Sequence, residues 1–173
     1  GDLPTWTGSA HRGEIVFAAA LADWRVVTAS EDCTARVEYD ELRHDLLLGH
    51  TGPIHHAAVR SDERQFATAS DDGTCRLWNL ERTWESRHRL FASNGEVMRM
   101  LVRLEFSPNS ERILIAQIDQ ANVLDVGTSM AIARRGGYSK TSYWLDSANI
   151  VQISHPIRVI DGTTADVRLE LPV

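Results

Sequence analysis

The sequence contains almost no lysine. Lys140 is the only lysine among 18 basic residues, and the other 17 are arginine. These arginines are dispersed along the chain and are outnumbered by 24 acidic residues, which gives a formal net charge of −6. Because nucleic-acid-binding surfaces require clustered positive charge, we do not expect a nucleic-acid partner.

Long apolar runs and cysteines are also scarce. No apolar stretch approaches the ~20 residues that a membrane-spanning helix requires. The first residues, GDLPTWTGS, have no charged-then-apolar pattern of a secretory signal. Cys33 and Cys75 are too few for a disulfide framework, or for a metal cage by themselves. We therefore expect two free thiols, a cytoplasmic location without membrane contact, and no metal or other cofactor.

Helical periodicity is nearly absent, although 43% of the 173 residues are apolar. Short runs of Val, Ile, Phe, Thr and Ala are cut by polar corners such as SDER (Ser61–Arg64) and SDDG (Ser70–Gly73). This pattern is typical of short strands joined by tight turns. We assign AAALADW (Ala18–Trp24) to a strand followed by a corner, because its aligned partner runs into a loop. The clearest region predicts strands at Pro53–Val59, Gln65–Ser70, Thr74–Leu80 and His88–Ala92.

The sequence of one predicted hairpin occurs twice in the chain. VTASEDCTARVEYDEL at Val27–Leu42 aligns with ATASDDGTCRLWNLER at Ala67–Arg82 at an offset of 40 residues. Upstream, HRG at His11–Gly13 aligns with HTG at His50–Gly52 at an offset of 39, so one residue is gained between the two, as a loop permits. A period near 40 with regular turn signals is typical of a repeat array.

The corner residues carry a resemblance to a known family. Gly49-His50, followed by SDDGT at Ser70–Thr74 and by Leu77-Trp78-Asn79, resembles the WD-repeat family of β-propellers. The match is most complete over residues 49–80, partial over 11–40 and faint from 95 onward. It implies an all-β fold of about four four-stranded antiparallel blades, part of a larger propeller. The implied division is an outer strand of a preceding blade at 1–8 and blades at 9–49, 50–93, 94–136 and 137–173.

The family's motif also implies a structural lock, in which a histidine, a serine or threonine, an aspartate and a tryptophan form a hydrogen-bonded chain. The matching residues are His50, Thr68 (or Ser70), Asp72 and Trp78 in the second unit and His11, Thr28 and Asp32 in the first. Glu38 stands at the tryptophan position of the first unit. We therefore expect that lock to be broken and replacement of Glu38 by alanine to be nearly neutral.

Two fainter copies follow. Val97–Gly127 keeps a Ser-Pro-Asn corner at Ser107–Asn109. Tyr138–Gly162 is followed by a predicted outer strand at Ala165–Leu171, and Asp2–Thr7 is predicted to be an outer strand of a preceding blade. Since propellers of this family usually close with more than four blades, we expect completion by further repeats, by a second copy or by another chain.

No catalytic motif is present: the sequence has neither a phosphate-binding glycine loop nor a nucleophile elbow. His55 and His56 are adjacent in a predicted strand, so they point to opposite faces and cannot bind one metal ion together. Glu31 and Asp71 each precede a lock aspartate. These two acids, with His55 and Thr51, are the predicted partner-binding residues.

The resemblance and the lack of catalytic motifs predict a non-enzymatic interaction or sensor module that scaffolds or docks a protein. The arginine bias suggests a GC-rich bacterial genome, in which such repeats are appended to signalling proteins. Two alternatives stay open: an enzyme acting through the central channel, with Glu105 and Asp146 as inward candidates, and a self-assembling half-propeller. Three tryptophans near corners are either partner anchors or blade caps, namely Trp24, Trp84 and Trp144.

Overall fold

The computed structural model describes residues 11–40, 43–81, 101–117, 120–128, 131–136, 141–153 and 156–171. Every regular element in these ranges is a β-strand. Accordingly, the described ranges contain no helix that is long and apolar enough to cross a membrane. The expectation of an all-β fold is confirmed.

The strands form four antiparallel sheets, each connected in chain order. The first sheet comprises β1 (Ile15–Ala20), β2 (Val26–Ser30), β3 (Ala35–Glu38) and β4 (His44–Leu47). The second comprises β5 (Ile54–Val59), β6 (Gln65–Ser70) and β7 (Cys75–Asn79). The third comprises β8 (Leu101–Phe106), β9 (Arg112–Gln117), β10 (Gln120–Asp125) and β11 (Ala131–Gly136). The fourth comprises β12 (Thr141–Trp144), β13 (Asn149–Ile153), β14 (Ile157–Asp161) and β15 (Val167–Leu171).

The first three strands predicted for the second unit correspond to β5, β6 and β7. The assignment of Ala18–Trp24 is also confirmed, since β1 ends at Ala20 and a turn follows. The predicted strands at His88–Ala92 and Asp2–Thr7 lie outside the described residues. The exact blade boundaries stay a prediction.

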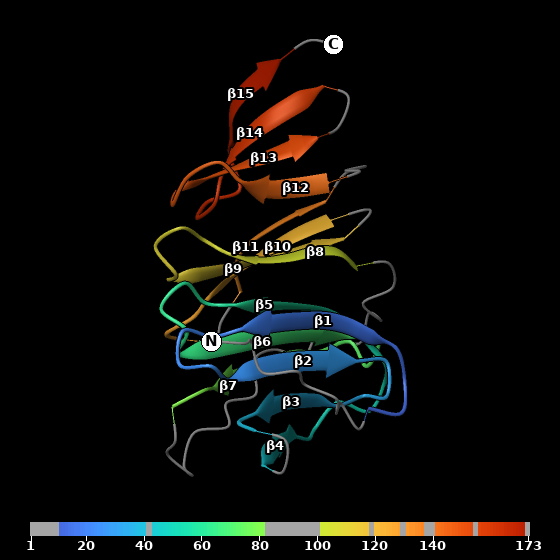
Figure 1. Cartoon of the computed structure of the whole chain (residues 1–173). Helices are drawn as coiled ribbons and strands as arrows, with labels where there is room; N and C mark the ends of the chain where they lie inside the picture. Colours follow the sequence, from blue (N-terminus) through green and yellow to red (C-terminus); the bar gives the residue numbers. More distant parts are fainter. Residues whose placement is uncertain are drawn as a thin grey trace.

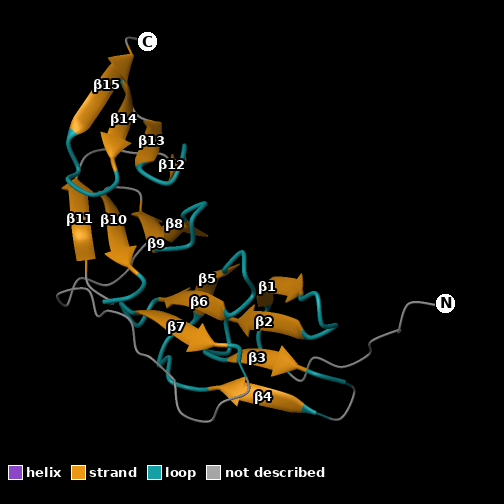
Figure 2. Cartoon of the chain, turned by 90° about the vertical axis from the view of Figure 1, so that its left-hand side faces the viewer, coloured by secondary structure: helices purple, strands orange, loops and turns teal. Residues whose placement is uncertain are grey.

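The sheets are stacked face to face in chain order, in a curved row from β1–β4 to β12–β15 (Figures 1 and 2). The innermost strands are neighbours: β1 contacts β5, β5 contacts β8, and β8 contacts β12. Because side chains alternate between the two faces of a strand, each middle sheet supplies one face to the sheet before it and one to the sheet after it. In β6, for example, Phe66 joins the core shared with the first sheet, whereas Ala67 joins the core shared with the third.

Three apolar cores therefore lie between successive sheets. In the first core, Val27 and Val37 of the first sheet are clustered with Ile54, Phe66 and Trp78 of the second. In the second, Ala69 and Leu77 are clustered with Ile113 and Leu124 of the third sheet. In the third, Leu114 and Val123 are clustered with Trp144 and Ile150 of the fourth sheet. Burial of apolar area between sheets is the main source of stability, at about 25 cal/mol per Å².

The first strand of each of the first three sheets is bulged near its start. The pairing register shifts between Ile15 and Phe17 in β1, and between Ile54 and His56 in β5. A shift of the same kind occurs near the start of β8. A bulge inserts one unpaired residue and re-aims its side chain. In β5 the extra residue is His55.

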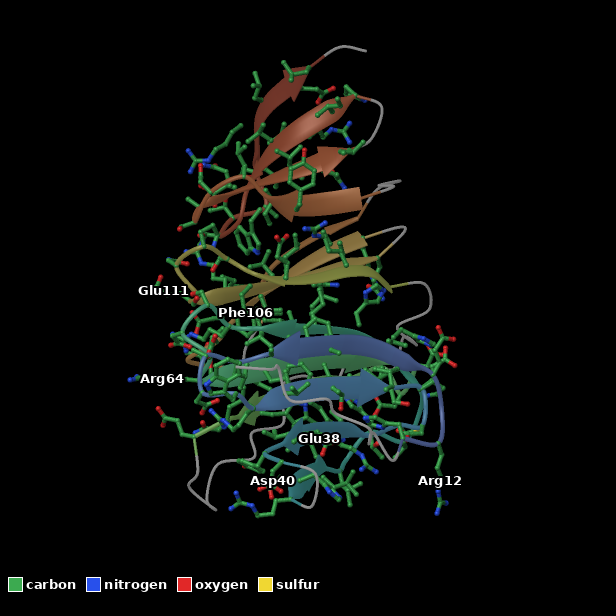
Figure 3. The ribbon with its side chains drawn as sticks, viewed as in Figure 1. Arg12, Glu38, Asp40, Arg64, Phe106 and Glu111 are labelled. Carbon is green, nitrogen blue, oxygen red and sulfur yellow. The ribbon has the colours of Figure 1, made fainter. Side chains whose placement is uncertain are left out.

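The turns gather at two opposite rims. The entry rim consists of the segments that lead into the first two sheets (11–14 and 49–53) and the turns after their second strands (31–34 and 71–74). The opposite rim consists of the turns between the first and second strands of three sheets (21–25, 60–64 and 107–111). Figure 3 shows Arg12 at one end of the sheets and Arg64 and Glu111 at the other.

Candidate partner-binding site and the relay that supports it

A buried relay of four side chains crosses the second sheet. The Trp78 Nε1–H donates to Thr68 Oγ1 at 2.9 Å. Thr68 Oγ1 lies 2.8 Å from His50 Nε2, and His50 Nδ1 lies 2.8 Å from Asp72 Oδ2. Because an indole can only donate and a carboxylate only accepts, the Thr68 hydroxyl donates to Nε2 and Nδ1–H donates to Asp72. Every hydrogen of the relay then has one acceptor.

Asp72 joins the relay to the turn around it. Its Oδ1 accepts hydrogen bonds from the amide and hydroxyl of Thr74, and its Oδ2 accepts one from the amide of Thr51. Burial pushes the pKa of Asp72 upward, but the hydrogen bonds from Thr74, His50 and Thr51 outweigh it and hold this pKa below its usual value. The carboxylate is thus a fixed negative centre that organises the corner.

His50 is held neutral. Its side chain is almost fully buried, and this burial lowers its pKa despite the opposing effect of Asp72. Protonation at Nε2 would also remove the acceptor that the Thr68 hydroxyl uses. His50 therefore acts as a hydrogen-bonding link.

Residues 42–79 match the family model described as WD domain, G-beta repeat (WD40). The matched segment includes β5, β6 and β7 and all four residues of the relay. This segment is a WD repeat. With its stacked antiparallel sheets, the fold is a partial β-propeller. WD repeats in general mediate protein–protein interactions and are not themselves active sites.

The first unit has the same relay without its indole. His11 Nδ1 lies 3.0 Å from Asp32 Oδ2, and His11 Nε2 lies 2.9 Å from Thr28 Oγ1. The expectation that this lock is broken is wrong for these three residues, because their hydrogen bonds do not need the tryptophan. The one difference is at the tryptophan position: Glu38 stands there, so Thr28 lacks the indole donor that Thr68 has in the second unit.

Glu38 is more constrained than its sequence position suggests. Its side chain is at the end of β3 and only 2% exposed. Its Oε1 is buried without a hydrogen-bond partner. A buried carboxyl oxygen without a partner is unfavourable. This burial argues against a neutral replacement, and the effect of removing Glu38 stays a prediction.

The alternative between Thr68 and Ser70 is resolved by their contacts. The Ser70 hydroxyl donates to the carbonyl of Gly52 and accepts the amide of Asp72. It supports the corner, while Thr68 belongs to the relay. Gly52 is required there because a Cβ at this position would lie 2.9 Å from the Asp72 amide nitrogen.

Above the relay, three of the predicted partner-binding residues meet at the entry rim. His55 Nε2 lies 3.0 Å from Asp71 Oδ2, and its Nδ1 lies 3.9 Å from Glu31 Oε1. The two acids come from different sheets, and the bulge in β5 places the imidazole between them. All three side chains are about two-fifths exposed. Thr51, the fourth predicted residue, is exposed on the segment that leads into β5.

The residues suggested for a catalytic channel do not assemble into one site. Glu105 lies on the innermost strand β8 but is paired with Arg103. Asp146 lies in the turn after β12, where its carboxylate accepts the amides of Ala148 and Asn149. It is a turn residue because the innermost strand has already ended at Trp144.

Metal-binding groups and thiols were the remaining candidates for reactive chemistry in the described part of the chain. The described residues contain no group of three His, Cys, Asp or Glu side chains that could hold a metal ion. Both cysteines are free. Cys75 is buried, and this raises the pKa of its thiol to about 12, so it is inert at neutral pH.

The tryptophans differ in role. Trp144 is only 8% exposed and packs against the third sheet, where its Nε1–H donates to the Glu105 carbonyl at 3.3 Å. Trp24 is 73% exposed. Trp84 lies outside the described residues. Sequence spacing could not separate these cases, because burial depends on the neighbouring sheet.

Replacing Trp78 and Glu38, which occupy equivalent positions, should have opposite effects. Trp78→Phe leaves Thr68 without its donor and should lower the unfolding free energy by about 1–3 kcal/mol. Glu38→Leu removes a buried carboxyl group whose Oε1 has no hydrogen-bond partner, and it should raise the unfolding free energy by about 1 kcal/mol. Urea unfolding of both variants measures the difference. A loss of stability in both would contradict the assigned environment of Glu38.

Acidification should weaken the fold through His50 first. Because its folded pKa is lowered, its contribution is fully present above the unfolded value of about 6.5 and is lost as pH falls below it. Asp72, whose pKa is also lowered, adds a second loss below about pH 4. Unfolding free energies at pH 7.5 and 5.0 should show a smaller drop for His50→Gln than for the unmodified chain. An equal drop would mean that His50 does not titrate on unfolding.

Proposed function

We propose that this chain is a non-enzymatic interaction module that docks or senses a protein partner through its entry rim. The observation that carries the proposal is the meeting of Glu31, His55 and Asp71, which brings acids from two sheets to one exposed place. Interaction is the general role of WD repeats.

The entry rim has the rigidity that a docking surface needs. Asp71 directly precedes the relay aspartate of the second unit, and Glu31 precedes that of the first. Hydrogen bonds hold both turns, since the amide of Asp71 donates to Pro53 and the amide of Glu31 donates to Glu14. Presenting charges from a fixed backbone lowers the ordering cost of binding.

The chemistry of this site favours a partner with a basic patch. The two exposed carboxylates would attract arginine or lysine side chains and steer their approach. A partner cation could also displace His55 from Asp71. As part of the same proposal, we place the module in the cytoplasm of a bacterium, as a scaffold or sensor in signalling.

Charge reversal at the entry rim tests the proposed function. Proteins captured by the unmodified chain are compared with those captured by Glu31→Lys/Asp71→Lys and by Glu81→Lys, which changes an exposed acid elsewhere. A true partner should be captured by the unmodified chain and by the control but not by the double variant. In a kinetic measurement at low salt, its association rate with the double variant should be at least about tenfold lower. Unchanged binding to the double variant would reject the entry rim as the docking site.

We also propose that a further β-sheet covers the fourth sheet. The face of β13–β15 that points away from the third sheet carries paired Val151, Val159 and Leu169, and Ile157 paired with Leu171. Leu169 and Leu171 are about half exposed. The corresponding face of every earlier sheet packs on the next sheet, and an apolar face of this kind is normally covered. Further repeats are the proposed cover, with a second copy or another chain as alternatives.

The open face predicts how the isolated chain behaves in solution. It should bind an apolar dye and self-associate with rising concentration, and Leu169→Glu should reduce both without lowering the melting temperature. Leu48→Glu, at another exposed leucine, serves as the control. Sedimentation that shows a discrete dimer would identify a second copy as the cover. A monodisperse monomer without dye binding would contradict an uncovered face.

A further inference from the structure

The opposite rim contains an unusual residue, Trp24. Its side chain is 73% exposed, the largest exposed fraction among the large hydrophobic side chains of the described residues. Its backbone has a φ of 68°, in the left-handed region that disfavours bulky residues. The equivalent corners of the next two sheets carry Glu63 and Ser110 in the same conformation. The turn therefore does not require an aromatic residue, and an exposed indole there needs another explanation.

The turn that carries Trp24 is rigid. The amide of Trp24 donates to Leu21, and the amide of Leu21 donates to Arg25. Leu21 is itself buried in the first core. The amide of Ala22 donates to Glu63 Oε2 at 2.7 Å, which ties the turn to the second sheet. The indole is thus presented to solvent from a turn fixed on both sides, as binding anchors are.

Two carboxylates are held at the turn that carries this indole. The Asp23 side chain is 54% exposed, and Glu63 reaches the turn from the neighbouring sheet. The arginine of this turn, Arg25, is turned inward: its side chain is 16% exposed, and it binds Asp23 and the carbonyl of Leu80. Arg64, which follows Glu63 in the sequence, is exposed but pairs with Glu81. An aromatic face flanked by carboxylates is suited to a cation, most of all to a planar guanidinium.

We propose that Trp24, Asp23 and Glu63 form a second recognition site, which takes an arginine side chain from an extended protein segment. The guanidinium stacks on the indole and its N–H groups face the two carboxylates. Because Trp24 precedes β2 and Glu31 follows it, the two sites lie at opposite ends of the same strand. This site can therefore be tested independently of the entry rim.

Indole resonances provide a direct test. The full chain is titrated with the peptide acetyl-Gly-Arg-Gly-Arg-Gly-amide while the Nε1–H signals are followed by NMR, with Trp24→Phe identifying the Trp24 signal. That signal should shift with saturation, whereas peptides with serine or leucine in place of arginine should not move it. Asp23→Asn/Glu63→Gln removes both negative charges while keeping one acceptor oxygen at each position, and it should weaken binding at least about fivefold. Leu145→Ala, at an exposed leucine in the turn after β12, should leave the titration unchanged.

Three results would overturn this site. The first is a Trp24 signal that does not move with the arginine peptide. The second is an equal response to the leucine peptide, which would indicate a purely apolar anchor. The third is a response to phosphatidylcholine vesicles alone, which would indicate a lipid surface. Glu31→Lys/Asp71→Lys should not alter the titration, so failure of the entry rim leaves this test intact.

Discussion

The structure depends on one constraint: the apolar faces of these small sheets must be covered, and successive sheets cover one another. A single repeat unit of this kind cannot bury its apolar face by itself. The chain meets the constraint by repetition, because the face that leaves one sheet packs on the face that enters the next. Stability is therefore shared among neighbours, as in other repeat proteins.

Packing between sheets leaves the rims free, and the relays make the entry rim rigid. In the WD repeat the four side chains run from the core strand β7 to the turn after β6, so the hydrogen-bonded corner is anchored in the interior. The first unit shows that histidine, threonine and aspartate suffice for this geometry. In the second unit the indole of Trp78 adds a hydrogen-bond donor and apolar area. Glu38, at the equivalent position of the first unit, supplies neither.

The two rims present different chemistry from the same framework. At the entry rim a bulge aims His55 between acids of adjacent sheets. At the opposite rim, turns of equivalent shape carry unlike residues, with an exposed indole only in the first of the three. Substitutions at turn corners change a surface without disturbing the cores, which is why a repeated fold can have distinct faces.

The sequence by itself determined the strand class and the period of the repeat, because alternation and turn chemistry are local. The members of the relay came from the family resemblance, which left Thr68 and Ser70 as alternatives until their contacts were known. It could not determine the burial of Glu38 or the exposure of Trp24. Nor could it reveal the meeting of Glu31, His55 and Asp71. The exposure of a corner residue depends on which face a neighbouring sheet covers, and the meeting of the three side chains depends on where a bulge shifts the register. Both arise from contacts between residues far apart in the chain. Trp144 and Trp24 both lie near corners, yet only the packing of the third sheet against the fourth buries one of them.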